Sequence, residues 1–286
     1  MPDSQLGLVW KTSRRILDLG SKPLLMAIIN VTPDSFSDGG AYLELDAAIA
    51  AAEKALEEGA DIIDIGGEST RPGSRRVSVE EESERIVPLV EDLARRFEAP
   101  ISVDTSKAEV ARRALNAGAE IINDISAFRF DPGVAAVCAE SGAGIVLMHS
   151  RGAFEEMHSK EPVPDIFKEL VESLSESVQT GLDAGIAEES IVIDPGIGFG
   201  KSFEQNLELV GASDRLRAEI NGFPVLIGVS RKSFIGRILD DAPVSNRLHG
   251  TLAANAVALM GGANVVRVHD VGPHFDLIQV LGALRK

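Results

Sequence analysis

The sequence of 286 residues predicts a (β/α)8 barrel, also called a TIM barrel. Eight short apolar runs alternate with segments of helical periodicity, which is the pattern of a parallel sheet covered by helices. Eight such pairs in about 260 residues fit the closed barrel, with its usual length of about 250 residues, better than an open doubly wound sheet. The expected strands are residues 24–29, 61–65, 101–103, 120–122, 144–148, 191–193, 224–229 and 264–268.

Local signals place helices between these strands. The alanine-rich segment 44–58 precedes Gly59, and glycine commonly ends a helix. Ser78 followed by Glu81 predicts a capping box at the start of the next helix. Asp131 followed by Pro132 combines an N-cap residue with a proline suited to the first helical turn. The alternation therefore rests on helix boundaries as well as on apolar runs.

Every apolar run stops at polar side chains that can bind or react. In chain order these are Asn30, the stretch Glu68, Ser69, Thr70 and Arg71, then Asp104, Asn123 with Asp124, His149, Asp194, the stretch Ser230, Arg231 and Lys232, and His269 with Asp270. In a barrel the carboxyl ends of all strands open on one face, where active sites lie. Two connections on this face, 31–43 and 67–77, are rich in Pro, Ser, Gly and charged residues and are expected to close over a ligand.

Composition narrows the class of protein. The net charge of −16 argues against a nucleic-acid surface, which needs clustered Lys and Arg. Neither a signal-peptide pattern nor a long apolar stretch is found, and the single Cys138 fits a reducing compartment, so we expect a cytoplasmic protein without a membrane span. No linker divides the chain, which predicts one domain over 1–286, with a core of about 22–286 and an amino-terminal extension of 1–21.

Common cofactor motifs fail on their spacing. Gly200, Lys201 and Ser202 resemble the end of a phosphate-binding P-loop, but Pro195 occupies the position of its first glycine. Glycines 196, 198 and 200 lack the final spacing of a dinucleotide fingerprint. The histidines and the single cysteine form no zinc-binding pattern.

Four motifs carry a family resemblance. They are residues 30–40 (NVTPDSFSDGG), 64–73 (DIGGESTRPG), 194–201 (DPGIGFGK) and 230–233 (SRKS). Together, and in this order, they are similar to the signatures of the dihydropteroate synthase family. The resemblance extends from about residue 26 to residue 271. It implies a transferase of folate and tetrahydrofolate biosynthesis that condenses 6-hydroxymethyl-7,8-dihydropterin pyrophosphate with p-aminobenzoate, giving 7,8-dihydropteroate and pyrophosphate.

The pterin ring suits the strand-end carboxylates, because its 2-amino-pyrimidinone edge offers adjacent N–H donors and charge-assisted pairs fix orientation. Asp104, Asn123 and Asp194 follow three different strands and could converge on this edge. The resemblance matches them to the family's pterin-binding positions, together with Lys232 and Met148. The competing interpretation is that each carboxylate only caps the helix after its strand.

A diphosphate leaving group needs cations and oriented donors, because negative charge accumulates on it as the C–O bond breaks. The side chains expected to supply them are Asn30, Thr70, Arg71, Arg267 and His269. Arg267 and His269 lie two apart in a strand and should point the same way. An unpaired buried arginine is costly, so an anionic partner is expected at Arg267. The resemblance implies Mg²⁺ at Asn30, with Asp38 and, more weakly, Asp34 as further ligands.

The p-aminobenzoate pocket is expected from residues of the same rim. Ser233, near the start of the helix after residues 230–232, could hold the carboxylate, or could only cap that helix. The other expected pocket residues are Phe36, Pro72, Phe199 and Ser230. Sulfonamides, which mimic p-aminobenzoate, are expected inhibitors, and the resemblance also implies a homodimer.

The mechanism that the resemblance implies is dissociative, with Lys232, Arg267 and Asp104 as the catalytic residues. Pyrophosphate leaves first, the ring delocalises the methylene cation and the neutral arylamine attacks. Two alternatives share the pocket: a methyltransferase that uses methyltetrahydrofolate, and a catalytically silent pterin-binding protein. The anion site at residues 230–233 favours the synthase.

Overall fold

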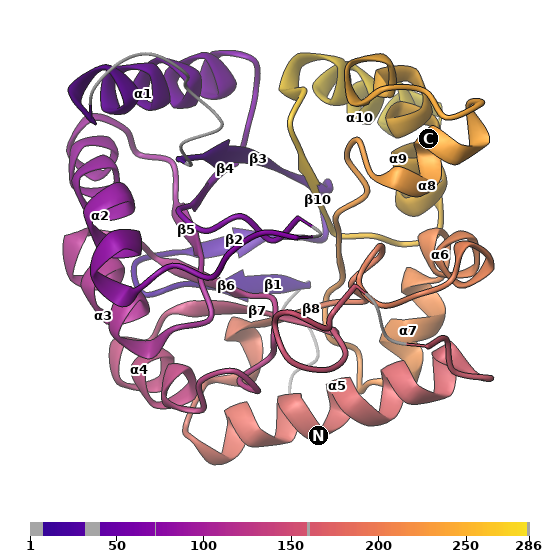
Figure 1. Ribbon diagram of the computed structural model, residues 1–286, viewed down its shortest axis with the longest axis horizontal. Helices are drawn as coiled ribbons and strands as arrows, with labels where there is room; N and C mark the ends of the chain where they lie inside the picture. The colour runs from indigo at the N-terminus through magenta and orange to yellow at the C-terminus, as the bar shows by residue number, and fades with distance from the viewer. Residues whose placement is uncertain (1–7, 32–40, 72, 159–160, 285–286) are drawn as a thin grey trace.

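The computed structural model describes residues 8–31, 41–71, 73–158 and 161–284. Its centre is a ring of eight parallel strands surrounded by helices (Figure 1). These strands are β3 (Leu24–Asn30), β4 (Ile62–Gly66), β5 (Ile101–Asp104), β6 (Ile121–Asp124), β7 (Gly144–Met148), β8 (Ile191–Asp194), β9 (Leu226–Ile227) and β10 (Val265–Val268). The order β8-β7-β6-β5-β4-β3-β10-β9 closes through a parallel bridge between Ile193 and Val225. The predicted (β/α)8 barrel is confirmed.

Helices follow the strands as the sequence predicted, with extra ones late in the chain. They are α1 (Ala41–Glu57), α2 (Val79–Arg96), α3 (Ala108–Ala117), α4 (Gly133–Ser141), α5 (Ile166–Asp183), α6 (Phe203–Val210), α7 (Ser213–Glu219), α8 (Ser233–Ile238), α9 (Leu248–Met260) and α10 (Val271–Leu284), with short 3₁₀ turns η1 (Glu188–Ser190) and η2 (Val244–Asn246). None of these helices is long and apolar enough to cross a membrane, as far as the described residues extend.

Helix starts test the predicted caps. The Ser78 hydroxyl accepts from the Glu81 N–H, as expected, but the Glu81 carboxylate pairs with Arg85 at 2.5 Å and not with the cap backbone. Asp131 accepts from the Gly133 N–H at 3.0 Å and also from the Ala108 N–H at 2.7 Å. One aspartate therefore caps two neighbouring helices, because α3 and α4 begin side by side.

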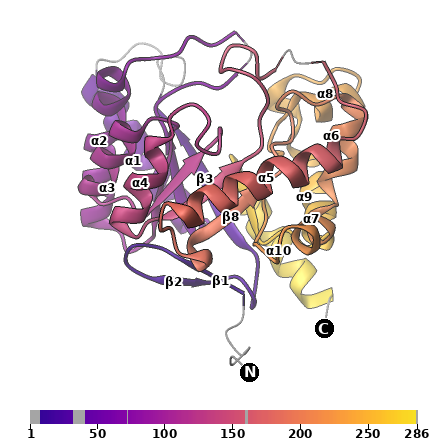
Figure 2. The same ribbon diagram turned by 90° about the horizontal axis from the view of Figure 1, so that it is seen from below.

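The amino-terminal segment contains a hairpin that the sequence did not reveal. The strands β1 (Val9–Lys11) and β2 (Ile16–Asp18) pair antiparallel at one end of the barrel (Figure 2). Trp10 is fully buried there and packs on an inner layer from seven barrel strands: Met26, Ile62, Ile121, Val146, Val192, Leu226 and Val265. Its indole N–H donates to the Ser190 carbonyl at 3.0 Å, and a side chain at Gly144 would lie 3.0 Å from the indole nitrogen. The hairpin closes the barrel opposite the strand carboxyl ends.

Candidate active site

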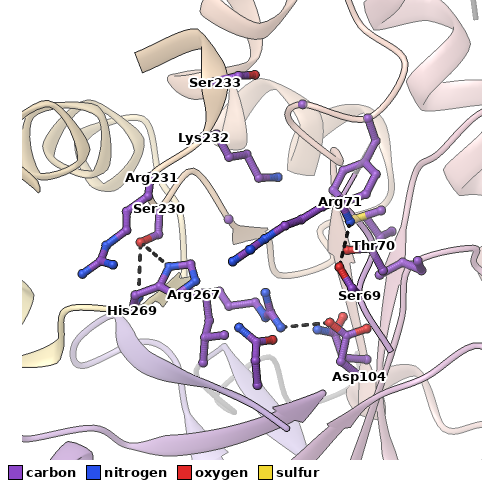
Figure 3. A pocket seen from close by; sticks show the side chains of 18 of the residues that line it. Ser69, Thr70, Arg71, Asp104, Ser230, Arg231, Lys232, Ser233, Arg267 and His269 are labelled. Carbon is purple, nitrogen blue, oxygen red and sulfur yellow. Dashed lines mark hydrogen bonds and ion pairs between the residues drawn. The ribbon is translucent and has the colours of Figure 1, made fainter. Parts of the chain in front are cut away.

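A pocket of about 560 Å³ opens at the carboxyl ends of the barrel strands. The predicted site residues that line it come from the ends of all eight barrel strands and the loops that follow them (Figure 3): Asn30, Thr70, Arg71, Asp104, Asn123, Met148, Asp194, Phe199, Ser230, Lys232, Ser233, Arg267 and His269. Every predicted site residue within the described ranges is therefore at one pocket. Phe36, Asp38, Asp34 and Pro72 lie outside the described residues.

The pocket floor is an ion cluster around Arg267. The Arg267 Nε donates to Asp64 Oδ2 at 2.6 Å, and its Nη2 donates to Asp104 Oδ2 at 2.9 Å. Asn123 Nδ2 donates to the same Asp64 oxygen at 3.2 Å. The anionic partners expected at Arg267 are therefore the protein carboxylates Asp64 and Asp104. Burial, opposed by Arg267 and reinforced by Asp64, raises the pKa of Asp104 to about 7.

Strand β4 ends in glycine, which keeps this floor open. A Cβ at Gly66 would lie 3.4 Å from Asn30 Oδ1 and 3.7 Å from the Asp104 Cβ. These are van der Waals distances, so the Gly66 position lies directly between the two polar side chains from neighbouring strands β3 and β5. Asn30 itself lines the pocket.

Asp194 and Lys232 face the pocket from β8 and from the start of α8. Asp194 is 6% exposed, and its Oδ1 accepts from the Gly196 N–H at 2.7 Å. Burial raises the pKa of Asp194, with Lys232 opposing the shift. The Lys232 ammonium donates to the Ile197 carbonyl and lies 4.6 Å from the centre of the Phe199 ring. Burial lowers the pKa of Lys232 to about 8, with Asp194 opposing.

A rim of hydrogen-bond donors follows β9 and β10. The Ser230 hydroxyl oxygen accepts from the His269 backbone N–H at 3.2 Å and lies 3.0 Å from His269 Nδ1. The Ser230 hydroxyl thus joins the backbone and the ring of His269. Desolvation and the positive charges of Arg267 and Arg231 lower the pKa of His269 to about 4. His269 is therefore a neutral donor near pH 7 and not a cation.

The loop after β4 is fastened at both ends. Glu68 Oε1 accepts from the Val77 N–H at 2.7 Å and from Lys107 Nζ at 2.8 Å, while Arg85 donates to the Gly67 carbonyl at 2.7 Å. His158 Nε2 lies 2.7 Å from the Thr70 carbonyl. These contacts hold Thr70 and Arg71 at the pocket edge.

Several pocket residues were missing from the predicted site. Glu68, Ser69 and Arg231 line the pocket and had a signal, because they belong to the polar stretches after strands. His158 and Arg247 come from within long connections, where no pattern marks their direction. The Arg231 guanidinium turns to Asp270, with Nε 2.9 Å from Oδ2, so Arg231 contributes little free charge. Ser233 is the first residue of α8, and Lys232 occupies the N-cap position without a side-chain cap.

The fold and the pocket together define a barrel enzyme with a site for a polar, partly anionic ligand. Residues 26–269 match the family model described as pterin binding enzyme. The dihydropteroate synthase of Escherichia coli strain K12 is 47% identical over 93% of this chain and 93% of its own. The chain belongs to the dihydropteroate synthase family of pterin-binding enzymes.

Solved structures agree with this assignment. The Xanthomonas albilineans dihydropteroate synthase with 4-aminobenzoic acid superposes with a TM-score of 0.91 at 41% identity, over 98% of this chain and 99% of that one. The Yersinia pestis dihydropteroate synthase in a sulfonamide drug complex gives a TM-score of 0.90 at 40% identity, over 97% of this chain and 99% of that one.

Proposed function

We propose that this chain condenses 6-hydroxymethyl-7,8-dihydropterin pyrophosphate with p-aminobenzoate to form 7,8-dihydropteroate and pyrophosphate. The observation that carries the proposal is the convergence of Asp104, Asn123 and Asp194 on one pocket that also contains Lys232 and Arg267. In the reaction the C–O bond to the diphosphate breaks, a C–N bond to the arylamine forms, and the amine loses a proton. The order is dissociative, so the pocket must first stabilise the departing charge.

The pterin ring binds by its N–H edge to the carboxylates. Asp194 and Asn123 are buried, and Asp104 lies 2.9 Å from Arg267, so all three are held in fixed positions before the ligand enters. Lys232 reaches the carbonyl side of the ring, while Met148, which is 4% exposed, packs on its face. Preset polar groups of this kind give strong charge-assisted hydrogen bonds without reorganisation.

The affinity for the pterin is expected to rise with pH up to about 7, because ring N–H donors favour ionised Asp104, whose pKa burial raises to about 7. Arg267 opposes this shift, while Asp64, Glu82 and Glu68 reinforce it. Native Asp104 keeps its proton at pH values where an unfolded aspartate has lost it. Its contribution to the free energy of unfolding therefore falls as the pH rises toward about 7. Calorimetric titration from about pH 6 to about pH 8 should show proton release on binding. This role would be contradicted if the wild-type affinity for the pterin did not change with pH and equalled the affinity of Asp104→Asn.

The diphosphate binds at the opposite rim. Arg71, Arg267 and the neutral His269 supply N–H donors, and Thr70 and Asn30 complete the set. Mg²⁺ prefers oxygen ligands and usually keeps phosphate oxygens and waters as its other ligands. Asn30 fits this pattern, because it carries an amide oxygen and lines the pocket at the end of β3. We place Mg²⁺ at Asn30, with Asp38 as the candidate second ligand. The bound ion would neutralise phosphate charge.

The p-aminobenzoate lies above the pterin. Phe199 is 9% exposed, stacks on His158 with 5.1 Å between ring centres, and offers an apolar wall. Ser233 at the start of α8 holds the carboxylate, and Phe36 and Pro72 are candidates for the remaining wall.

Pyrophosphate release provides the test of this function. Release is expected only when the pterin ester, p-aminobenzoate and Mg²⁺ are all present, and chelation of Mg²⁺ should slow it while leaving binding of the unesterified pterin unchanged. Coupled phosphate detection after pyrophosphatase measures the rate. Methyl transfer from methyltetrahydrofolate, or pterin binding without turnover, would support one of the two alternatives.

Sulfonamides are expected to compete with p-aminobenzoate, because they share its ring and present an anionic group to Ser233. Steady-state rates measured at several p-aminobenzoate concentrations should extrapolate to the same maximal velocity with and without the sulfonamide. Inhibition that lowers the maximal velocity and leaves KM unchanged would remove the proposed arylamine pocket.

We also propose a cytoplasmic homodimer. Helices α9 and α10, which contact one another, expose the apolar side chains Val257, Met260, Val280 and Leu284. Exposed apolar side chains on neighbouring helices support an interface there. Sedimentation equilibrium should give twice the chain mass, and a monomer at micromolar concentration would refute the dimer. The buried Cys138 thiol is consistent with a reducing compartment.

A further inference from the structure

The loop between β8 and α6 folds around a lysine that does not line the pocket. Lys201 closes this loop, which spans residues 194–201. Its Nζ donates to the Gly196 carbonyl at 2.8 Å and to the Phe199 carbonyl at 3.1 Å. Gly196 has φ +65°, and a Cβ there would lie 1.9 Å from the His149 carbonyl oxygen. The loop is thus pressed against the end of β7 with its carbonyls directed inward.

The third partner of Lys201 is a buried histidine. His149 follows β7, is 2% exposed, and places Nδ1 3.0 Å from Lys201 Nζ. Burial lowers the pKa of Lys201 to about 7, with Asp194 opposing the shift. In its ammonium form Lys201 only donates, so Nδ1 accepts and the imidazole proton lies on Nε2, 3.6 Å from Glu169 Oε1. The His149 carbonyl lies 3.4 Å from Nζ as a fourth acceptor, so each of the three ammonium protons has an acceptor. Burial and the positive charge of Lys201 lower the pKa of His149 to about 2, in agreement with a neutral ring.

The loop that Lys201 holds supplies two pocket features. The Ile197 carbonyl, next to Gly196, accepts from the Lys232 ammonium. Phe199, whose carbonyl Lys201 binds, lies 4.6 Å from Lys232 Nζ and forms the aromatic wall. At Gly198, which lies between them, the N–H donates to Asn206 Oδ1 at 2.6 Å. The backbone between residues 196 and 199 therefore fixes both Lys232 and the Phe199 ring.

We propose that Lys201 is a positioning residue. Its hydrogen bond to His149 and its bonds to loop carbonyls hold the 194–201 loop, so that Lys232 and Phe199 contact both substrates. This role rests on the proposed function of those two residues. A neutral side chain could not satisfy two carbonyls and an imidazole nitrogen together. Arginine is larger and planar, so it would not reproduce this compact set of contacts.

The test compares Lys201→Met with Leu209→Ala, a cavity variant in the neighbouring helix α6, where Leu209 is 1% exposed. Loss of the charged hydrogen bonds should raise the KM for p-aminobenzoate and the Kd for the pterin by about tenfold or more. The kcat should change less, because Arg267 on the diphosphate side is held by Asp64 and Asp104. Leu209→Ala should lower Tm and leave both constants within about twofold of wild type.

A second pair of variants tests the hydrogen bond between Lys201 and His149. His149→Asn keeps an acceptor at the Nδ1 position and should retain the wild-type constants, whereas His149→Leu should reproduce the effect of Lys201→Met. In wild type, ¹⁵N NMR of labelled histidine should show an unprotonated Nδ1 and a protonated Nε2 for His149. This spectrum tests the lysine contact even if the enzyme proves inactive, so failure of the proposed function is distinguishable.

Three results would overturn the proposal. The first is unchanged KM and Kd in Lys201→Met. The second is that Leu209→Ala, with the same loss of Tm as Lys201→Met, changes KM and Kd by equal amounts. The third is that His149→Leu has the same KM and Kd as His149→Asn. This third result decides the question even if Lys201→Met does not fold.

Discussion

Replacement of Arg267 by alanine is expected to slow pyrophosphate release by about 10²–10³-fold in a single turnover, the usual effect of removing one donor to developing charge. Two of its nitrogens already bind Asp64 and Asp104, so the guanidinium is preset. Among the residues that the structure describes, none accepts from Nη1, which is left for the diphosphate. Rapid-quench measurement of pyrophosphate formation gives the rate.

Stability must be separated from chemistry in this variant. Asp64 is fully buried, and removal of its partner leaves an unpaired charge that costs about 3–5 kcal/mol of folding free energy. The double variant Arg267→Ala with Asp64→Asn should regain most of that stability, since Asn123 can still donate to residue 64. The rate of pyrophosphate release should stay low in this double variant. A normal single-turnover rate in Arg267→Ala would refute its role, and a rate restored by Asp64→Asn would make that role structural only.

Replacement of Asp104 by asparagine is expected to weaken pterin binding by about 1.5–3 kcal/mol, the scale of a hydrogen bond to a charged group. The affinity loss is about tenfold or more. Asp104 is 14% exposed by its side chain and faces the pocket from β5, so the lost charge is poorly screened. Isothermal calorimetry with the unesterified pterin measures the change.

Asp124 offers a matched control one strand away. Its carboxylate is buried and accepts from the Ser126 and Phe128 N–H groups at 2.8 and 2.7 Å. Asp124→Asn should therefore lower Tm and leave pterin affinity unchanged. Equal affinity in Asp104→Asn and wild type would exclude Asp104 from the pterin site.

The sequence was informative about the site because barrel geometry converts strand ends into neighbours. Asp104, Asn123 and Asp194 are far apart in the chain, yet each lies at or next to the carboxyl end of a parallel strand, so their convergence followed from topology. Asp64 was not predicted as a site residue, because it lies inside β4 and its pairing with Arg267 depends on strand register. Periodicity shows which side chains face inward, and it does not show which charges meet.

The amino-terminal hairpin and the buried lysine were missed for another reason. Strands β1 and β2 have three residues each, too few for an alternating pattern, and Trp10 becomes a core residue only through contacts with distant strands. Lys201 belonged to the failed phosphate motif and to the 194–201 family motif, but neither gave it a role of its own. Its partners are backbone carbonyls, which carry no residue signature.

A crystal structure with the bound pterin ester would test the central claim most directly. The ring should lie with its N–H edge on Asp104, Asn123 and Asp194, its carbonyl side toward Lys232, and its diphosphate toward Arg267 and His269. A ring bound outside this pocket, or one that leaves the three strand-end side chains without contact, would contradict the account.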